Sequence, residues 1–137
     1  MGRLFIERVK WLNLPVDQYI VVGSGLLDVL GIRRSNDIDL VVDEALYDKL
    51  RGLPGYVEDS SLDEERLLYR GGEAELWKSW PTMYGRWRIG DFMSGSEIIN
   101  GVRFITLDFL RQWKVWHDQP KDRQDIALID AYLGANL

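Results

Sequence analysis

Residues 19–43 read YIVVGSGLLDVLGIRRSNDIDLVVD, and they combine two apolar runs, a glycine-rich turn and a pair of aspartates. Its branched apolar runs predict two strands, over residues 19–22 and 37–42. Because residues i and i+2 of a strand point to the same face, we expect Asp37 and Asp39 to converge on one patch of space. Two carboxylates held that close repel each other unless a cation lies between them or one binds a proton. The ordinary alternative is a solvent-facing edge strand, but aspartate is depleted in strands, so the pair indicates a site.

A glycine-rich turn, Gly23-Ser24-Gly25, follows the first strand and leads into a short helix expected over residues 26–30. Its backbone N–H groups are not obstructed by large side chains, which suits a phosphate group at a helix N-terminus. The same kind of turn also connects strands to helices where no ligand binds. Together with the acid pair, the turn indicates chemistry on a nucleoside triphosphate.

The composition excludes several classes of protein. With 137 residues and 46% apolar residues, the chain is expected to form a single domain over residues 1–137. No run approaches the roughly 18 apolar residues that span a bilayer, and charges within the first ten residues argue against a signal peptide. We therefore expect a cytoplasmic protein with no membrane segment.

The charge and the metal-binding residue types narrow the chemistry further. There is no cysteine and only one histidine, so any metal is expected to be a hard cation bound by oxygen. The net charge of −5 argues against a protein that grips duplex DNA. Arg33-Arg34 and Arg86-Trp87-Arg88 are the two candidates for a local basic patch.

The rest of the chain predicts a mixed α+β domain. The other expected elements are helices over residues 4–11 and 45–50, strands over residues 56–57, 67–69, 73–77, 97–99 and 102–105, and two C-terminal helices that begin after Thr106 and at Pro120. Gly71-Gly72 and Asn100-Gly101 predict two-residue hairpin turns, whereas residues 81–93 are expected to be irregular. The fold class is therefore a small mixed twisted sheet flanked by helices, with two C-terminal helices.

These features resemble the DNA polymerase beta-type nucleotidyltransferase superfamily, and in particular its small single-domain bacterial members. That superfamily is marked by a strand, a Gly-Ser or Gly-Gly turn that opens a helix, and then an Asp-x-Asp strand. Here residues 25–36 separate Gly23-Ser24 from Asp37, which falls within the usual spacing. The run over residues 31–36 resembles the arginine-and-hydroxyl run that often precedes the acid pair in bacterial members.

The likeness extends to the C-terminal part of the chain. Residues 99–110 resemble the closing hairpin and helix of small bacterial members. In those proteins a helix lysine is followed by a Pro-Lys-Asp turn and a second helix, a pattern that Lys114, Pro120-Lys121-Asp122 and Asp125 match. The resemblance therefore covers most of residues 19–133.

The resemblance implies the nucleotidyltransferase fold and a site in which three carboxylates bind metal and take part in catalysis. Two of them are Asp37 and Asp39, and the third comes from a neighbouring strand with apolar flanks. Glu75 is the best match for the third carboxylate, and Glu73, two residues away on the same face, is the alternative.

The resemblance also implies which residues contact the nucleotide. These are Gly23, Ser24, Arg34, Ser35 and Lys114. Each has an ordinary structural alternative: an empty turn for the first two, a solvated loop for the next two, and a stem packed along the core for Lys114.

The reaction implied is transfer of a nucleoside monophosphate from a nucleoside triphosphate, with ATP expected, to an acceptor hydroxyl, with release of pyrophosphate. Two Mg²⁺ ions, or Mn²⁺, are the expected cofactors. The acceptor is left open between a small molecule, an RNA end and a protein. The alternatives are a catalytically weak or inactive nucleotide-binding regulatory protein, antitoxin-like and acting with a partner protein, and a structural interaction domain without a ligand.

Overall fold

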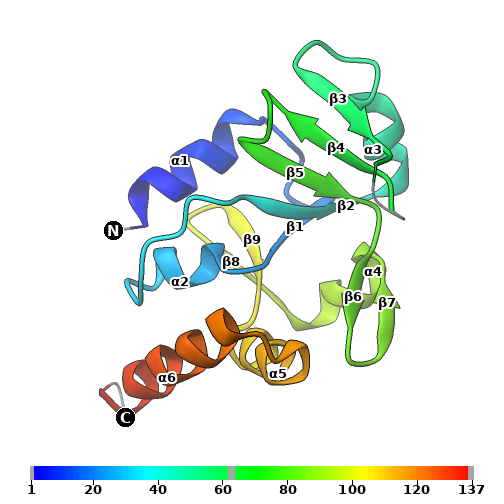
Figure 1. Ribbon diagram of the computed structural model, residues 1–137. Helices are drawn as coiled ribbons and strands as arrows, with labels where there is room; N and C mark the ends of the chain where they lie inside the picture. The colour runs from blue at the N-terminus through cyan, green and yellow to red at the C-terminus, as the bar shows by residue number, and fades with distance from the viewer. Residues whose placement is uncertain (1, 62–63, 136–137) are drawn as a thin grey trace.

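The computed structural model describes residues 2–61 and 64–135, which form a seven-stranded mixed sheet flanked by helices (Figure 1). In spatial order the strands are β3 (Tyr56–Asp59), β4 (Arg66–Tyr69), β5 (Ala74–Trp77), β2 (Asp39–Val42), β1 (Tyr19–Val22), β9 (Val102–Ile105) and β8 (Ser96–Ile99). β1 pairs antiparallel with β2 and parallel with β9, and β2 pairs parallel with β5. The expected mixed sheet flanked by helices is confirmed.

The helices connect the strands and close the chain. They are α1 (Arg3–Trp11), α2 (Gly25–Val29), α3 (Glu44–Leu50), α4 (Ile89–Phe92), α5 (Leu107–His117) and α6 (Pro120–Ala135), with a 3₁₀ turn, η1 (Met93–Gly95), after α4. The last two pack against each other at the α2 end of the molecule (Figure 1). Within the described ranges, no helix combines the length and the apolar character that a membrane span requires.

The centre of the sheet is the segment that the sequence predicts most directly. All four residues of β1 are buried, as their branched apolar side chains require. The strand expected over residues 37–42 begins only at Asp39, although the Ile38 carbonyl already accepts a hydrogen bond from the Glu75 N–H at 2.8 Å. Asp37 therefore lies just before the strand, at the end of the sheet.

The two predicted hairpins form, but with different connections. Asn100 and Gly101 both have positive φ, at 49° and 83°, and join β8 to β9 as a two-residue turn. In the other hairpin Tyr69 pairs with Ala74, so residues 70–73 form a four-residue connection between β4 and β5, longer than the expected Gly71-Gly72 turn.

The region expected to be irregular is partly regular. Residues 81–93 contain most of a second, two-stranded sheet, β6 (Trp80–Thr82) with β7 (Gly85–Trp87), followed by α4. This hairpin carries Trp80, whose ring lies against Trp77 of β5 at 5.6 Å and against Trp113 of α5 at 6.1 Å. The aromatic cluster joins the hairpin to the main sheet and places Trp80 in the same cavity as Asp39 and Glu75.

Candidate functional site

The parallel pairing of β2 with β5 brings the predicted carboxylates together. Asp39 lies directly opposite Glu75 in the register, so the two side chains share one face of the sheet. They line a cavity of about 320 Å³ with four other residues: Asp37, Ile38, Gly72 and Trp80. Asp37 and Asp39 both line this cavity, although Asp37 lies just before β2 and not within the strand as expected.

The carboxyl group of Asp39 is strongly perturbed. Burial raises its pKa to about 7, and the negative charges of Glu75 and Asp37 and a hydrogen bond with Glu75 act in the same direction. Asp39 is only partly buried, whereas Asp37 is exposed. This is the electrostatic signature of carboxylates that either share a proton or bind a cation.

Glu75 has a partner that the sequence does not reveal. Its Oε1 accepts a hydrogen bond from Nη1 of Arg66 on β4 at 2.9 Å. The same guanidinium donates to Asp59 Oδ2 at 3.0 Å and lies over the Trp77 ring. Arg66 therefore fixes the orientation of Glu75 and partly offsets the negative charge of the site.

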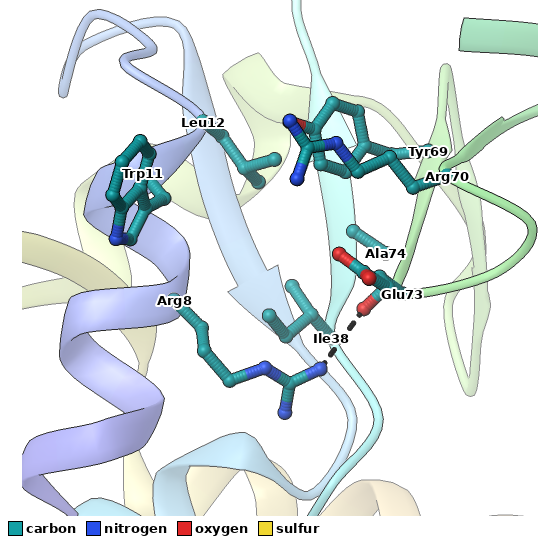
Figure 2. Close-up of a pocket in the computed structure, with 8 residues that line it drawn as sticks. All are labelled: Arg8, Trp11, Leu12, Ile38, Tyr69, Arg70, Glu73 and Ala74. Carbon is teal, nitrogen blue, oxygen red and sulfur yellow. Dashed lines mark hydrogen bonds between the residues drawn. The ribbon is translucent and has the colours of Figure 1, made fainter. Parts of the chain in front are cut away.

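The two candidates for the third carboxylate lie at different places. Glu73 belongs to the turn before β5 and lines a separate cavity beside α1, where its backbone carbonyl accepts a hydrogen bond from Arg8 at 3.2 Å (Figure 2). Glu75 lines the cavity that contains Asp37 and Asp39. The expectation that both glutamates share a face is wrong, because the strand begins after Glu73, and the geometry favours Glu75.

The glycine-rich turn lies close to the Asp39 carboxylate. Gly23 has a φ of +73°, and a Cβ atom at this position would lie 2.9 Å from Oδ2 of Asp39. Any side chain here would be strained and would press on the carboxylate, so the position requires glycine. Ser24 follows as the N-cap residue of α2, and its side chain makes no capping hydrogen bond to the helix.

The Ser24 hydroxyl instead joins a buried ionic network. Lys114 of α5, whose side chain is 3% exposed, donates from Nζ to Ser24 Oγ at 3.0 Å. It pairs with Asp125 at 2.9 Å and with Asp122 at 3.5 Å, both on α6. Asp125 also receives two hydrogen bonds from the Arg33 guanidinium. Lys114 thus lies behind Ser24, where it holds the turn, α5 and α6 together.

Two predicted nucleotide-contact residues are not brought to the carboxylates. Arg34 and Ser35 line a cavity beside α1 instead. The Ser35 N–H donates to the buried Asp28 carboxylate at 2.8 Å, which closes the loop after α2. These contacts favour the loop interpretation over nucleotide contact for both residues.

Arg66, Gly72 and Trp80 line or support the site and are absent from the predicted set. The strand expected over residues 67–69 offers a signal for Arg66, because a strand that began one residue earlier would contain this arginine. No comparable signal points to Trp80, because the sequence predicts no helix or strand around this residue.

The donors fit a hard divalent cation in their chemistry. Asp39 and Glu75 are adjacent carboxylates. A cation between them would offset both the burial of the Asp39 charge, which is the main cause of its raised pKa, and the repulsion from Glu75 that adds to it. Among residues 2–61 and 64–135, however, no group of three or more histidine, cysteine, aspartate or glutamate side chains is arranged to hold a metal ion. Glu75 is paired with Arg66, and Asp37 is exposed.

The raised pKa of Asp39 predicts a pH-dependent stability difference. The folded pKa of about 7 exceeds the unfolded value of about 3.9, so the wild-type chain loses stability as the pH rises through this window. Asp39→Asn does not titrate, so it should gain at least about 1 kcal/mol over wild type between pH 4 and pH 8, after allowance for partial exposure. Urea unfolding at both pH values measures this difference, and a difference that does not change with pH would contradict the prediction.

Comparison with known proteins finds no matching family model, no similar curated protein and no similar solved structure. Membership of the nucleotidyltransferase superfamily therefore stays a prediction from the sequence.

Proposed function

We propose that the protein has the nucleotidyltransferase fold and transfers a nucleoside monophosphate from a nucleoside triphosphate to an acceptor hydroxyl. The observation that carries this proposal is the register of β2 with β5, which sets Asp39 beside Glu75 in a cavity that Asp37 also lines. The close approach of the Gly23 backbone to the Asp39 carboxylate supports it, because a glycine turn there leaves room for a phosphate beside the acids.

The carboxylates have distinct roles in this proposal. Asp37, Asp39 and Glu75 would hold Mg²⁺. The bound ion would neutralise the negative charge on the phosphates and on the transition state. Glu75 accepts the proton of the acceptor hydroxyl, and its hydrogen bond from Arg66 sets the direction of its carboxylate. The Gly23 and Ser24 backbone N–H groups bind the triphosphate at the start of α2.

Lys114 acts on the phosphate turn indirectly. Because its ammonium group is buried and already bonded to Ser24 and Asp125, it positions the Ser24 hydroxyl rather than reaching the nucleotide itself. Such a fixed turn reduces the reorganisation needed when the triphosphate binds.

Incubation with each α-³²P-labelled nucleoside triphosphate, Mg²⁺ or Mn²⁺ and a cell lysate tests the proposal. We expect label from at least one nucleotide, with ATP the first candidate, to move to a small molecule, an RNA or a protein. Omission of the divalent ion should stop the transfer. The absence of transfer from all four nucleotides, with a folded protein and both ions, would contradict the proposal.

One observation favours a second candidate function, a nucleotide-binding regulatory protein without turnover that acts with a partner protein. Glu75 is engaged by Arg66, and no set of three metal ligands is assembled in the described part of the chain. Saturable nucleotide binding by calorimetry, with no transfer of label, distinguishes this function from the first.

A further inference from the structure

A second cavity, of about 270 Å³, lies between α1 and the turn that joins β4 to β5 (Figure 2). Its walls combine apolar side chains, two aromatic rings, two guanidinium groups and one carboxylate, so the positive charges outnumber the negative one. The lining residues are Arg8, Trp11, Leu12, Ile38, Tyr69, Arg70, Glu73 and Ala74. A cavity with an apolar base, flat rings and a few charged groups is typical of a small-molecule site.

The two arginines of this cavity differ in how they are held. Arg8 donates to the backbone carbonyls of Asn36 at 2.8 Å and Glu73 at 3.2 Å, which fixes one wall and leaves further N–H donors on its guanidinium. Arg70 lies over the Tyr69 ring at 5.2 Å, and no described carboxylate is paired with it. Arg70 is therefore a positioned cation without an anion.

Trp11 supplies a flat surface that the fold does not need. Its side chain is 80% exposed at the end of α1, although tryptophan is usually well buried. In Figure 2 it stands at the edge of the cavity, across from Arg70. An exposed indole and a guanidinium plane on two sides of one cavity favour a planar ring with a negative charge.

The cavity is also close to the carboxylates. Ile38 lines both cavities, and successive residues of the turn, Gly72 and Glu73, line one each. The two cavities are therefore adjacent, around the starts of β2 and β5. A ligand in the second cavity would therefore lie next to the cavity that contains Asp37 and Glu75.

We propose that this cavity binds a planar ring that carries an anionic group, with the ring against Trp11 and the anion paired with Arg70. The ligand's further role, as the acceptor whose hydroxyl is presented to the carboxylates, rests on the proposed function. The binding itself does not depend on the proposed function, because the two cavities have only Ile38 in common.

Titration of the ¹⁵N-labelled full chain with 2-aminobenzoate, without nucleotide or Mg²⁺, tests the binding. We expect saturable shifts at the Trp11 indole N–H and the Glu73 amide, both of which belong to residues that line this cavity, equal in wild type and Asp39→Asn. The neutral 2-aminobenzamide should bind about tenfold more weakly, as should cyclohexanecarboxylate, which lacks the flat ring. Because Asp39→Asn should lose transfer but keep this binding, the two proposals can fail independently of each other.

Exposed variants locate the site without threatening the fold. Trp11→Ala and Arg70→Gln should each raise the dissociation constant at least about tenfold, whereas Trp116→Ala and Arg123→Gln, exposed residues of α5 and α6, should leave it unchanged. Equal affinity in all four variants, or no saturable shift up to about 10 mM ligand, would overturn the proposal. A 5′-phosphorylated trinucleotide is then used to displace the bound 2-aminobenzoate. Displacement at a lower concentration than benzoate requires would identify the end of a nucleotide chain as the ligand that supplies the ring and the charge.

Discussion

Asp39→Asn is expected to lower Mg²⁺-dependent transfer of the labelled monophosphate by at least about a hundredfold while the chain stays folded. Asparagine keeps the shape of the side chain but removes the charge at the centre of the site. Asp39 faces Glu75 across the β2–β5 pair and lies beside the Gly23 backbone, so its carboxylate is placed between the second acid and the glycine turn. The rate of label transfer measures the effect, and circular dichroism checks the fold.

Asp43→Asn is the matched control for this variant. Asp43 follows the other end of β2 and lines a different cavity, beside α4. It should retain the wild-type rate. Full activity of Asp39→Asn under the same conditions would exclude a role for the acid pair in binding the metal, because a two-metal site would then have lost its central ligand without effect.

The local patterns of the sequence predict the strands and hairpins well, but they do not predict how distant strands pair. β1 is predicted with its observed bounds because four consecutive branched or aromatic residues require burial on both faces. The β6–β7 hairpin is not predicted, since its strands are only three residues long and Pro81 is a poor strand residue. Its position depends on tryptophan packing between separate elements, which no short pattern encodes.

The same limit applies to the candidate site. Asp37 and Asp39 are recognisable because their spacing is local. The choice between Glu73 and Glu75 stays open in the sequence, because it depends on where β5 begins and on its parallel pairing with β2. Lys114 is expected from the sequence to contact the nucleotide, and its bond to Ser24 is not predicted. Its burial behind the turn follows from the packing of α5 and α6, and direct contact with a nucleotide does not fit that burial.

Lys114→Met is expected to lower the free energy of unfolding by about 3 kcal/mol and the melting temperature by about 10 °C. Methionine keeps most of the packing volume but leaves the buried Asp125 carboxylate with Arg33 as its remaining cation. The Ser24 hydroxyl loses its donor at the same time, so the glycine turn and α5 are no longer joined by this bond. Urea and thermal unfolding of the two proteins measure the loss.

Arg111→Met is the matched control, because it removes an exposed ion pair with Asp130 between the same two helices and should cost less than about 1 kcal/mol. A pH series adds a second test. Burial raises the pKa of Asp125, but hydrogen bonds from Arg33 and Lys114 more than offset this and hold it below its ordinary value. That stabilisation is present above the unfolded pKa and is lost as the pH falls, so the difference between wild type and Lys114→Met should shrink below about pH 4. A loss no larger than that of the control, or one independent of pH, would mean that the buried pair does not hold the turn and the two helices together.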